Sequence, residues 1–126
     1  MSDALRGVLV SHGDVAQALA AAVHQITGET DALVPISNRN LGLERLQETV
    51  VEAIGPGPAV VFVDMPAGSC LQAVLRGVKG RTDVAVVAGV NLPMLLDFVY
   101  HRDLTAPAAA ERAVATAGRS VRTISV

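Results

Sequence analysis

Aromatic side chains are scarce in this 126-residue sequence, which has two phenylalanines, one tyrosine and no tryptophan. Few aromatics leave few platforms on which nucleic-acid bases could stack. An excess of one charge is also missing, since ten basic and twelve acidic residues are interspersed and the formal net charge is −2. Without a basic stripe there is no electrostatic basis for binding nucleic acid or an anionic membrane. We therefore expect no nucleic-acid partner.

Cysteine and long apolar runs are scarce as well. The single cysteine, Cys70, cannot form an internal disulfide, which agrees with a reducing compartment. The apolar runs are too short to span a bilayer. The first residues, MSDALRGVLV, lack the long apolar core of a secretion signal. These features predict a soluble, cytoplasmic protein.

The hydrophobic residues, which make up 51% of the sequence, are mostly aliphatic. They are enough to form the core of one domain over residues 1–126. Short apolar runs alternate with segments of helical periodicity. Strands are expected at 7–10, 32–35, 59–63, 84–88 and 120–126, and helices at 14–26, 41–54, 69–78, 92–100 and 107–117. Pro35 indicates that its strand ends there or lies at an edge. The alternation predicts an α/β fold, a doubly wound and mainly parallel sheet with helices on both faces.

Two polar residues directly follow buried strands of this sheet. His12 follows the strand at 7–10, and Asp64 follows the strand at 59–63. If these strands are neighbours where the strand order reverses, both side chains lie in the crevice that commonly holds ligands. An aspartate bonded to one imidazole nitrogen leaves the other as a nucleophile. With a helix start near Ser69 offering amides to an anion, the set favours phosphoryl transfer through phosphohistidine, and acid–base catalysis remains open.

Other candidate residues have simpler interpretations. Asp64 and Ser69 would also serve as helix caps. His24 lies within a helix and His101 near a helix end, where a cation suits the dipole, so neither is expected to be catalytic. Cys70 is expected to pack as a small apolar residue. No pair of histidine, cysteine or acidic residues has metal-ligand spacing, so no metal site is expected.

Three segments carry a resemblance to a known family. They are VLVSHGDVAQAL (8–19), VVFVDMPAGSC (60–70) and VAVVAGVNLPMLLDFVYHRD (84–103), of which GVNLPM (89–94) is the most specific. They resemble the enzyme IIA domain of the mannose family in the bacterial phosphoenolpyruvate:sugar phosphotransferase system. The resemblance extends over essentially the whole chain, in order and with similar spacing.

The resemblance implies a phosphocarrier. His12 would accept a phosphoryl group from phospho-HPr and pass it to a histidine of a IIB subunit, and Asp64 would orient and balance that histidine. Gly13, Gly68 and Ser69 are expected to bind the phosphoryl group. No metal and no cofactor is expected.

The resemblance also implies an assembly. In the family fold the last strand is antiparallel and exchanged between two subunits, so residues 120–126 would form that strand in a homodimer. Contact with the membrane would be indirect, through a permease complex.

Two departures from the family pattern bear on the function that the resemblance implies. Residues 65–70 read MPAGSC, where transport members carry a tryptophan-glycine-glycine-serine-proline run, and Asp14 places a negative charge beside the expected phosphate. These departures leave open a regulatory IIA domain and a phosphoryl donor of the dihydroxyacetone-kinase type. Also open are a binding module without phosphotransfer and a small hydrolase with His12 as general base.

Overall fold

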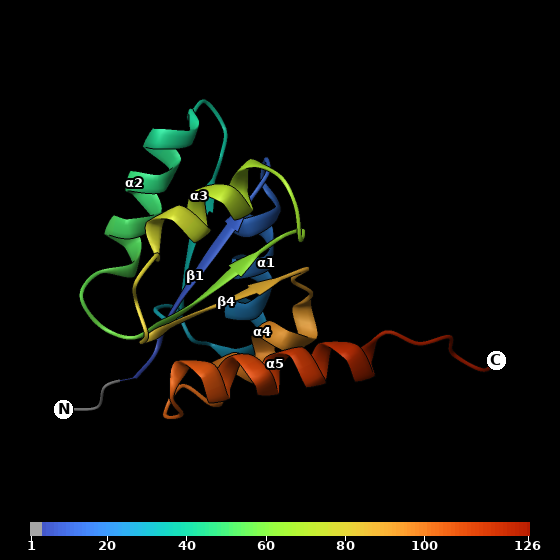
Figure 1. Cartoon of the computed structure of the whole chain (residues 1–126). Coiled ribbons are helices and arrows are strands. Elements are labelled where there is room, and N and C mark those ends of the chain that lie inside the picture. Colours follow the sequence, from blue (N-terminus) through green and yellow to red (C-terminus); the bar gives the residue numbers. More distant parts are fainter. Residues whose placement is uncertain (1–3) are drawn as a thin grey trace.

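The predicted alternation of strands and helices is present in the computed structural model, which describes residues 4–126 (Figure 1). In chain order the elements are β1 (Arg6–Ser11), α1 (Val15–Thr27), β2 (Leu33–Ser37), α2 (Leu43–Ile54), β3 (Ala59–Val63), α3 (Ser69–Gly77), β4 (Val84–Ala88), α4 (Leu92–Val99) and α5 (Ala106–Ser120). The α/β fold class is therefore confirmed. None of the helices in this described part has the length and apolar character needed to cross a membrane.

The four described strands are all parallel and lie in the order β2-β1-β3-β4. The chain moves from β1 to β2 on one side and then returns to β3 on the other, so the order reverses beside β1. Val10 of β1 pairs with Val63 of β3. The residues that follow these two strands are therefore neighbours at the carboxyl edge, where open α/β sheets bind ligands.

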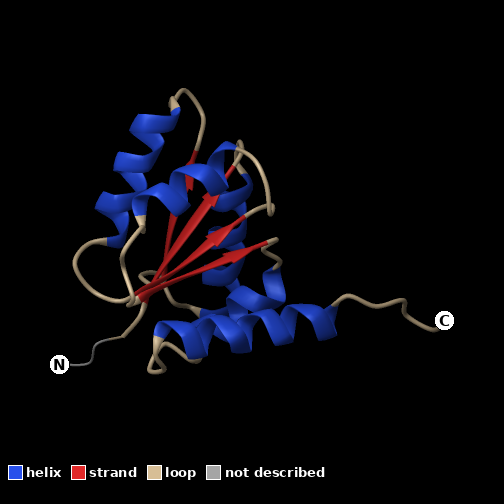
Figure 2. Cartoon of the chain, viewed as in Figure 1, coloured by secondary structure: helices blue, strands red, loops and turns tan. Residues whose placement is uncertain are grey.

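Helices cover both faces of this sheet (Figure 2). On one face α1, α4 and α5 enclose a cluster in which the rings of Phe62 and Phe98 meet edge to face, with centroids 5.1 Å apart. On the other face α2 and α3 pack over alternate residues of β1, Val8 and Val10. Every residue of β3 is buried, as a strand with two covered faces requires. This packing holds the carboxyl ends of β1 and β3 in fixed positions.

The predictions for the C-terminus were partly wrong. The last helix was expected at 107–117 but runs over Ala106–Ser120, and residues 121–126 form no strand in the described chain. The tail instead projects away from the domain (Figure 1), and the described sheet is entirely parallel. A strand needs a hydrogen-bonding neighbour, and α5 carries the tail past the sheet of its own chain. Exchange of this strand in a dimer stays a prediction.

Of the two positions expected for Pro35, the end of its strand or an edge of the sheet, the structure shows the second. Pro35 lies within β2, which is an outer strand of the sheet. A residue without an N–H group is tolerated there because one side of the strand has no ladder to complete.

Candidate functional site

The turn between β1 and α1 places His12 at the carboxyl edge of the sheet. The buried Ser11 ends β1, and its Oγ accepts a hydrogen bond of 2.7 Å from the backbone N–H of Ala16. Asp14 occupies the N-cap position, but its side chain makes no capping hydrogen bond. Ser11, and not Asp14, therefore supplies the side-chain acceptor at the start of α1, and it ties that helix to the end of β1 around His12.

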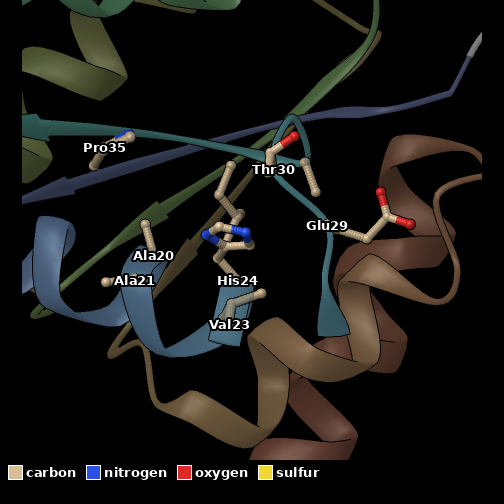
Figure 3. A pocket seen from close by; sticks show the side chains of 9 residues that line it. Ala20, Ala21, Val23, His24, Glu29, Thr30 and Pro35 are labelled. Atoms are coloured by element: carbon tan, nitrogen blue, oxygen red, sulfur yellow. The ribbon is translucent and has the colours of Figure 1, made fainter. Parts of the chain in front are cut away.

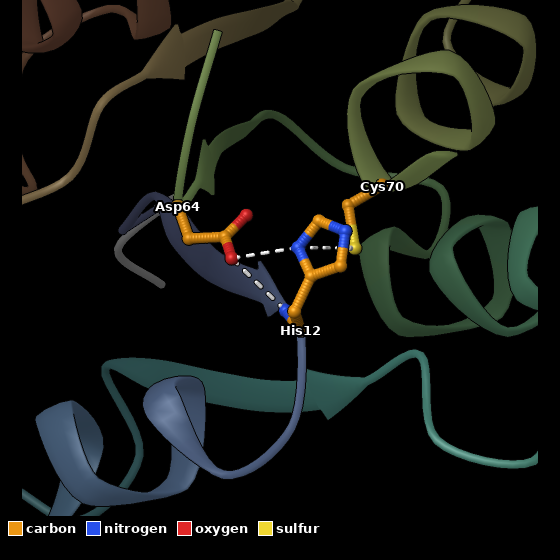
Figure 4. Close-up of side chains that lie close together, drawn as sticks. All are labelled: His12, Asp64 and Cys70. Atoms are coloured by element: carbon orange, nitrogen blue, oxygen red, sulfur yellow. Dashed lines mark hydrogen bonds and ion pairs between the residues drawn. The ribbon is translucent and has the colours of Figure 1, made fainter. Parts of the chain in front are cut away.

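Asp64 fixes the imidazole of His12 through two contacts to one oxygen (Figure 4). Asp64 Oδ2 accepts from the backbone N–H of His12 at 3.0 Å and lies 2.9 Å from its Nδ1. An ionised carboxylate can only accept, so Nδ1 carries the proton and Nε2 keeps its lone pair. The His12 side chain is 42% exposed and that of Asp64 only 14%. A partner can therefore reach the ring, while the carboxylate is sheltered.

The first residues of α3 lie against the free edge of the ring. Gly68 has a φ of +98°, and a Cβ built on it would lie 3.7 Å from Cε1 and 3.8 Å from Nε2 of His12. Gly68 is the N-cap of α3, and no side chain caps this helix. Its first-turn amides are therefore donors close to Nε2. Ser69 is the first helical residue and is exposed, so it is near the ring but is not the cap that the sequence suggested.

The loop after β2 contributes two residues that the sequence analysis missed. Asn38 Oδ1 accepts from the backbone N–H of Gly13 at 3.3 Å, so this amide is already used in the structure. Arg39 pairs with Asp14 at 3.1 Å, which compensates the acidic charge next to His12. Both residues follow the end of a strand adjacent to β1, and this position at a carboxyl end was the signal that could have identified them.

Cys70 lies in the second position of α3 and is fully buried. Its Sγ lies 3.8 Å from Nδ1 of His12, an approach that no spacing in the sequence indicated. Burial first, and the charge of Asp64 second, raise the pKa of the Cys70 thiol to about 11. The thiolate is therefore strongly disfavoured at neutral pH, which agrees with the packing role predicted and argues against Cys70 as a nucleophile.

The other two histidines lie in different environments. His24 lines a cavity of about 220 Å³ near the C-terminal end of α1, which Glu29 and Pro35 also line (Figure 3). Among residues 4–126 no carboxylate lies within ion-pair distance of its ring. His101 lies 2.7 Å from the carbonyl of Asp97 through Nδ1. The side chain of Asp97 also meets Arg112, so His101 belongs to a network that joins α4 to α5.

Comparison with known proteins identifies the family to which the chain belongs. The family model EIIA-man, described as PTS system fructose IIA component, matches residues 7–116. A comparison with the sequences of curated proteins gave no match.

Solved structures share the fold over nearly the whole chain. The mannose/sorbose-specific IIA subunit from Enterococcus faecalis has a TM-score of 0.85 at 24% identity and covers 100% of this chain and 97% of its own. EIIA from Streptococcus agalactiae has a TM-score of 0.87 at 17% identity, and the match covers 94% of this chain and 96% of that protein. A PTS IIA protein associated with the fucose utilization operon of Streptococcus pneumoniae has a TM-score of 0.82 at 22% identity. The match covers 98% of this chain and 96% of that protein.

The family match spans the strands and helices that build the His12 and Asp64 site. It confirms the resemblance to the mannose-type IIA domains and supports a phosphotransfer role with HPr and IIB proteins as the kind of partner that the family implies. The chain belongs to the EIIA-man family of IIA components of the sugar phosphotransferase system.

Proposed function

We propose that Nε2 of His12 accepts a phosphoryl group from phospho-HPr and passes it to a histidine of a IIB subunit. The observation that carries this proposal is the 2.9 Å contact between Nδ1 and Asp64 Oδ2. This contact leaves Nε2 as the nitrogen with a lone pair, on a ring that is 42% exposed. A second protein can therefore present a phosphohistidine to it.

The transfer is a substitution at phosphorus. The Nε2 lone pair forms the new N–P bond while the bond to the donor imidazole breaks, and the donor nitrogen keeps that electron pair. The His12 ring becomes cationic as Nε2 is substituted, and the adjacent Asp64 carboxylate stabilises that cation. Transfer to the IIB histidine repeats the step with His12 as the leaving group.

The start of α3 supplies the binding site for the transferred group. A phosphoryl group on Nε2 would lie beside Gly68, because that nitrogen lies 3.8 Å from the position of a Cβ there. The first-turn amides and the hydroxyl of Ser69 are donors for its oxygens. The amide of Gly13 takes part after it is released by Asn38 Oδ1, which now accepts from it.

The acidic residue next to His12 does not oppose this function. The exposed Asp14 carboxylate lies 3.1 Å from Arg39, so its charge is paired at the rim. The charge of Asp14 is therefore no argument against phosphorylation of His12. Whether the acceptor serves sugar uptake or its regulation depends on the IIB partner, and we place the relay in the cytoplasm.

The tail supports a homodimer. The outer edge of β4 is unpaired in the described chain, and the extended tail exposes three large apolar side chains: Val121, Ile124 and Val126. An unpaired edge and an apolar extended segment can satisfy one another between two copies. We propose that the tails are exchanged in this way.

Intact-mass spectrometry tests the phosphocarrier role. The protein is incubated with phosphoenolpyruvate, enzyme I and HPr, beside the variants His12→Ala and His24→Ala. We expect a gain of one acid-labile phosphoryl mass in the wild type and in His24→Ala, and none in His12→Ala. An unmodified wild type, with a known IIA protein phosphorylated in parallel, would contradict the proposal.

A further inference from the structure

We propose that His12, Asp64 and Cys70 form a site for a zinc-like divalent metal ion, and that metal binding there prevents phosphorylation of His12. The second half of this proposal rests on the proposed function. The three side chains come from the ends of β1 and β3 and from the start of α3. One imidazole nitrogen, one carboxylate oxygen and one thiol sulfur all lie within 4.8 Å of one another (Figure 4).

The separations are close to those of a tetrahedral centre. With bonds of about 2.0 Å to nitrogen and about 2.3 Å to sulfur, tetrahedral zinc holds these two atoms roughly 3.6 Å apart. Nδ1 of His12 and Sγ of Cys70 are 3.8 Å apart, and Nδ1 is 2.9 Å from Asp64 Oδ2. An ion is accommodated if the oxygen and the nitrogen separate by a few tenths of an ångström, which requires only small side-chain rotations.

The donor set selects the class of metal. Imidazole, thiolate and carboxylate together suit zinc and its cobalt analogue, whereas magnesium and calcium require oxygen ligands. Asp64 Oδ1 is buried and has no hydrogen-bond partner among the described residues, so an unused acceptor lies next to the set. The His12 side chain is 42% exposed, so the ring can be reached from solvent. A zinc ion with three protein ligands commonly takes a water as its fourth ligand.

Metal binding changes the ring nitrogen on which phosphorylation depends. The metal takes the Nδ1 lone pair, so the neutral ring carries its proton on Nε2 instead. The thiol of Cys70 loses its proton to solvent as the sulfur–metal bond forms. An Nε2 that bears a proton has no lone pair with which to attack phosphorus. The metal and the phosphoryl group therefore exclude one another at His12.

Metal binding is tested directly, without phosphorylation. The reduced, metal-free full chain is titrated with Zn²⁺ by calorimetry and with Co²⁺ by absorption spectroscopy, beside the variants Cys70→Ser and Cys70→Ala. We expect one ion per chain, a thiolate-to-cobalt charge-transfer band, and an affinity at least about tenfold lower in both variants. No binding, no such band, or equal affinity in the variants would overturn the proposed site. His24→Ala is the control for adventitious binding to a surface histidine.

The consequence is tested with phospho-HPr prepared beforehand, so that metal effects on enzyme I play no part. Transfer to His12 is compared with and without one equivalent of Zn²⁺ in each variant. With zinc, we expect the rate of phosphoryl transfer to fall at least tenfold in the wild type and to change little in Cys70→Ser. Equal transfer by zinc-bound wild type would overturn the exclusion. If no transfer occurs even without zinc, the phosphocarrier role fails while the binding titration still decides the metal site.

Discussion

At the scale of the residue, the chemistry of His12 depends on which ring nitrogen is occupied. Asp64 Oδ2 holds both the backbone N–H and Nδ1 of this one residue, so the ring can neither rotate freely nor exchange tautomers without loss of a contact. The nucleophilic nitrogen is thereby directed toward the start of α3. In the proposed phosphotransfer, the carboxylate would position the ring in the free protein and act as a counter-ion in the phosphorylated one.

The first prediction concerns the charge of that carboxylate. In Asp64→Asn the amide oxygen can still accept from Nδ1–H, but the negative charge that stabilises the imidazolium is lost. We expect phospho-HPr to phosphorylate His12 about 100-fold more slowly, measured by rapid quench and intact mass.

Asp14→Asn is the matched control, because it removes a carboxylate that is exposed and paired with Arg39. We expect its rate to stay within about threefold of the wild type, in keeping with the small effect of exposed ion pairs. Equal losses in both variants would mean that general surface charge, rather than contact with Nδ1, controls the rate.

Only part of the site could be predicted at this scale. The pairing of His12 with Asp64 followed from their positions after two buried strands. The approach of Cys70 Sγ to the same ring could not, because it depends on how the first turn of α3 packs in the fold. Asn38 and Arg39 were missed because nothing in their local pattern distinguishes a site loop from an ordinary turn.

At the scale of the element, the turn from β1 into α1 is held by a serine. Ser11 is the one buried polar side chain identified among the described residues. Its Oγ accepts from Ala16 N–H and donates to the carbonyl of His12 at 3.2 Å. The hydroxyl thus satisfies an otherwise free helix donor and holds the backbone of His12 in place.

The second prediction follows from this cap. Ser11→Ala leaves the Ala16 amide buried and unpaired, so we expect the free energy of unfolding to fall by about 1 kcal/mol. The measurement is urea denaturation followed by circular dichroism. Ser69→Ala is the control, since that serine is exposed and caps nothing, and its effect should stay within about 0.5 kcal/mol. A neutral Ser11→Ala would refute the capping role.

At the scale of the whole molecule, the sheet brings the carboxyl ends of β1 and β3 together and leaves each outer strand, β2 and β4, with one unpaired side. The order β2-β1-β3-β4 places β4 at an edge, and the tail after α5 projects from the domain (Figure 1). His12, Asp64 and Cys70 come together within one chain, whereas the outer side of β4 and the tail each lack a hydrogen-bonding neighbour in the described residues. These unpaired groups are the physical basis for the proposed dimer.

The third prediction is that the tail controls the oligomeric state. Sedimentation of the wild type should give twice the 13.0 kDa mass of one chain, and deletion of residues 121–126 should give monomers. Ile124→Asp tests the apolar contribution with the length retained, and should weaken the dimer because a carboxylate would be buried. Equal masses for wild type and deletion would contradict strand exchange.

The sequence by itself determined the fold class, because apolar periodicity specifies which segments become strands and helices, and the continuous run at 59–63 predicted a doubly covered central strand. It also determined that His12 and Asp64 follow strand ends. The tertiary structure alone decided that β1 and β3 are neighbours, which ring nitrogen is free, that a thiol lies beside it, and that α5 extends to Ser120. These depend on long-range packing of side chains against one another, which local periodicity does not encode.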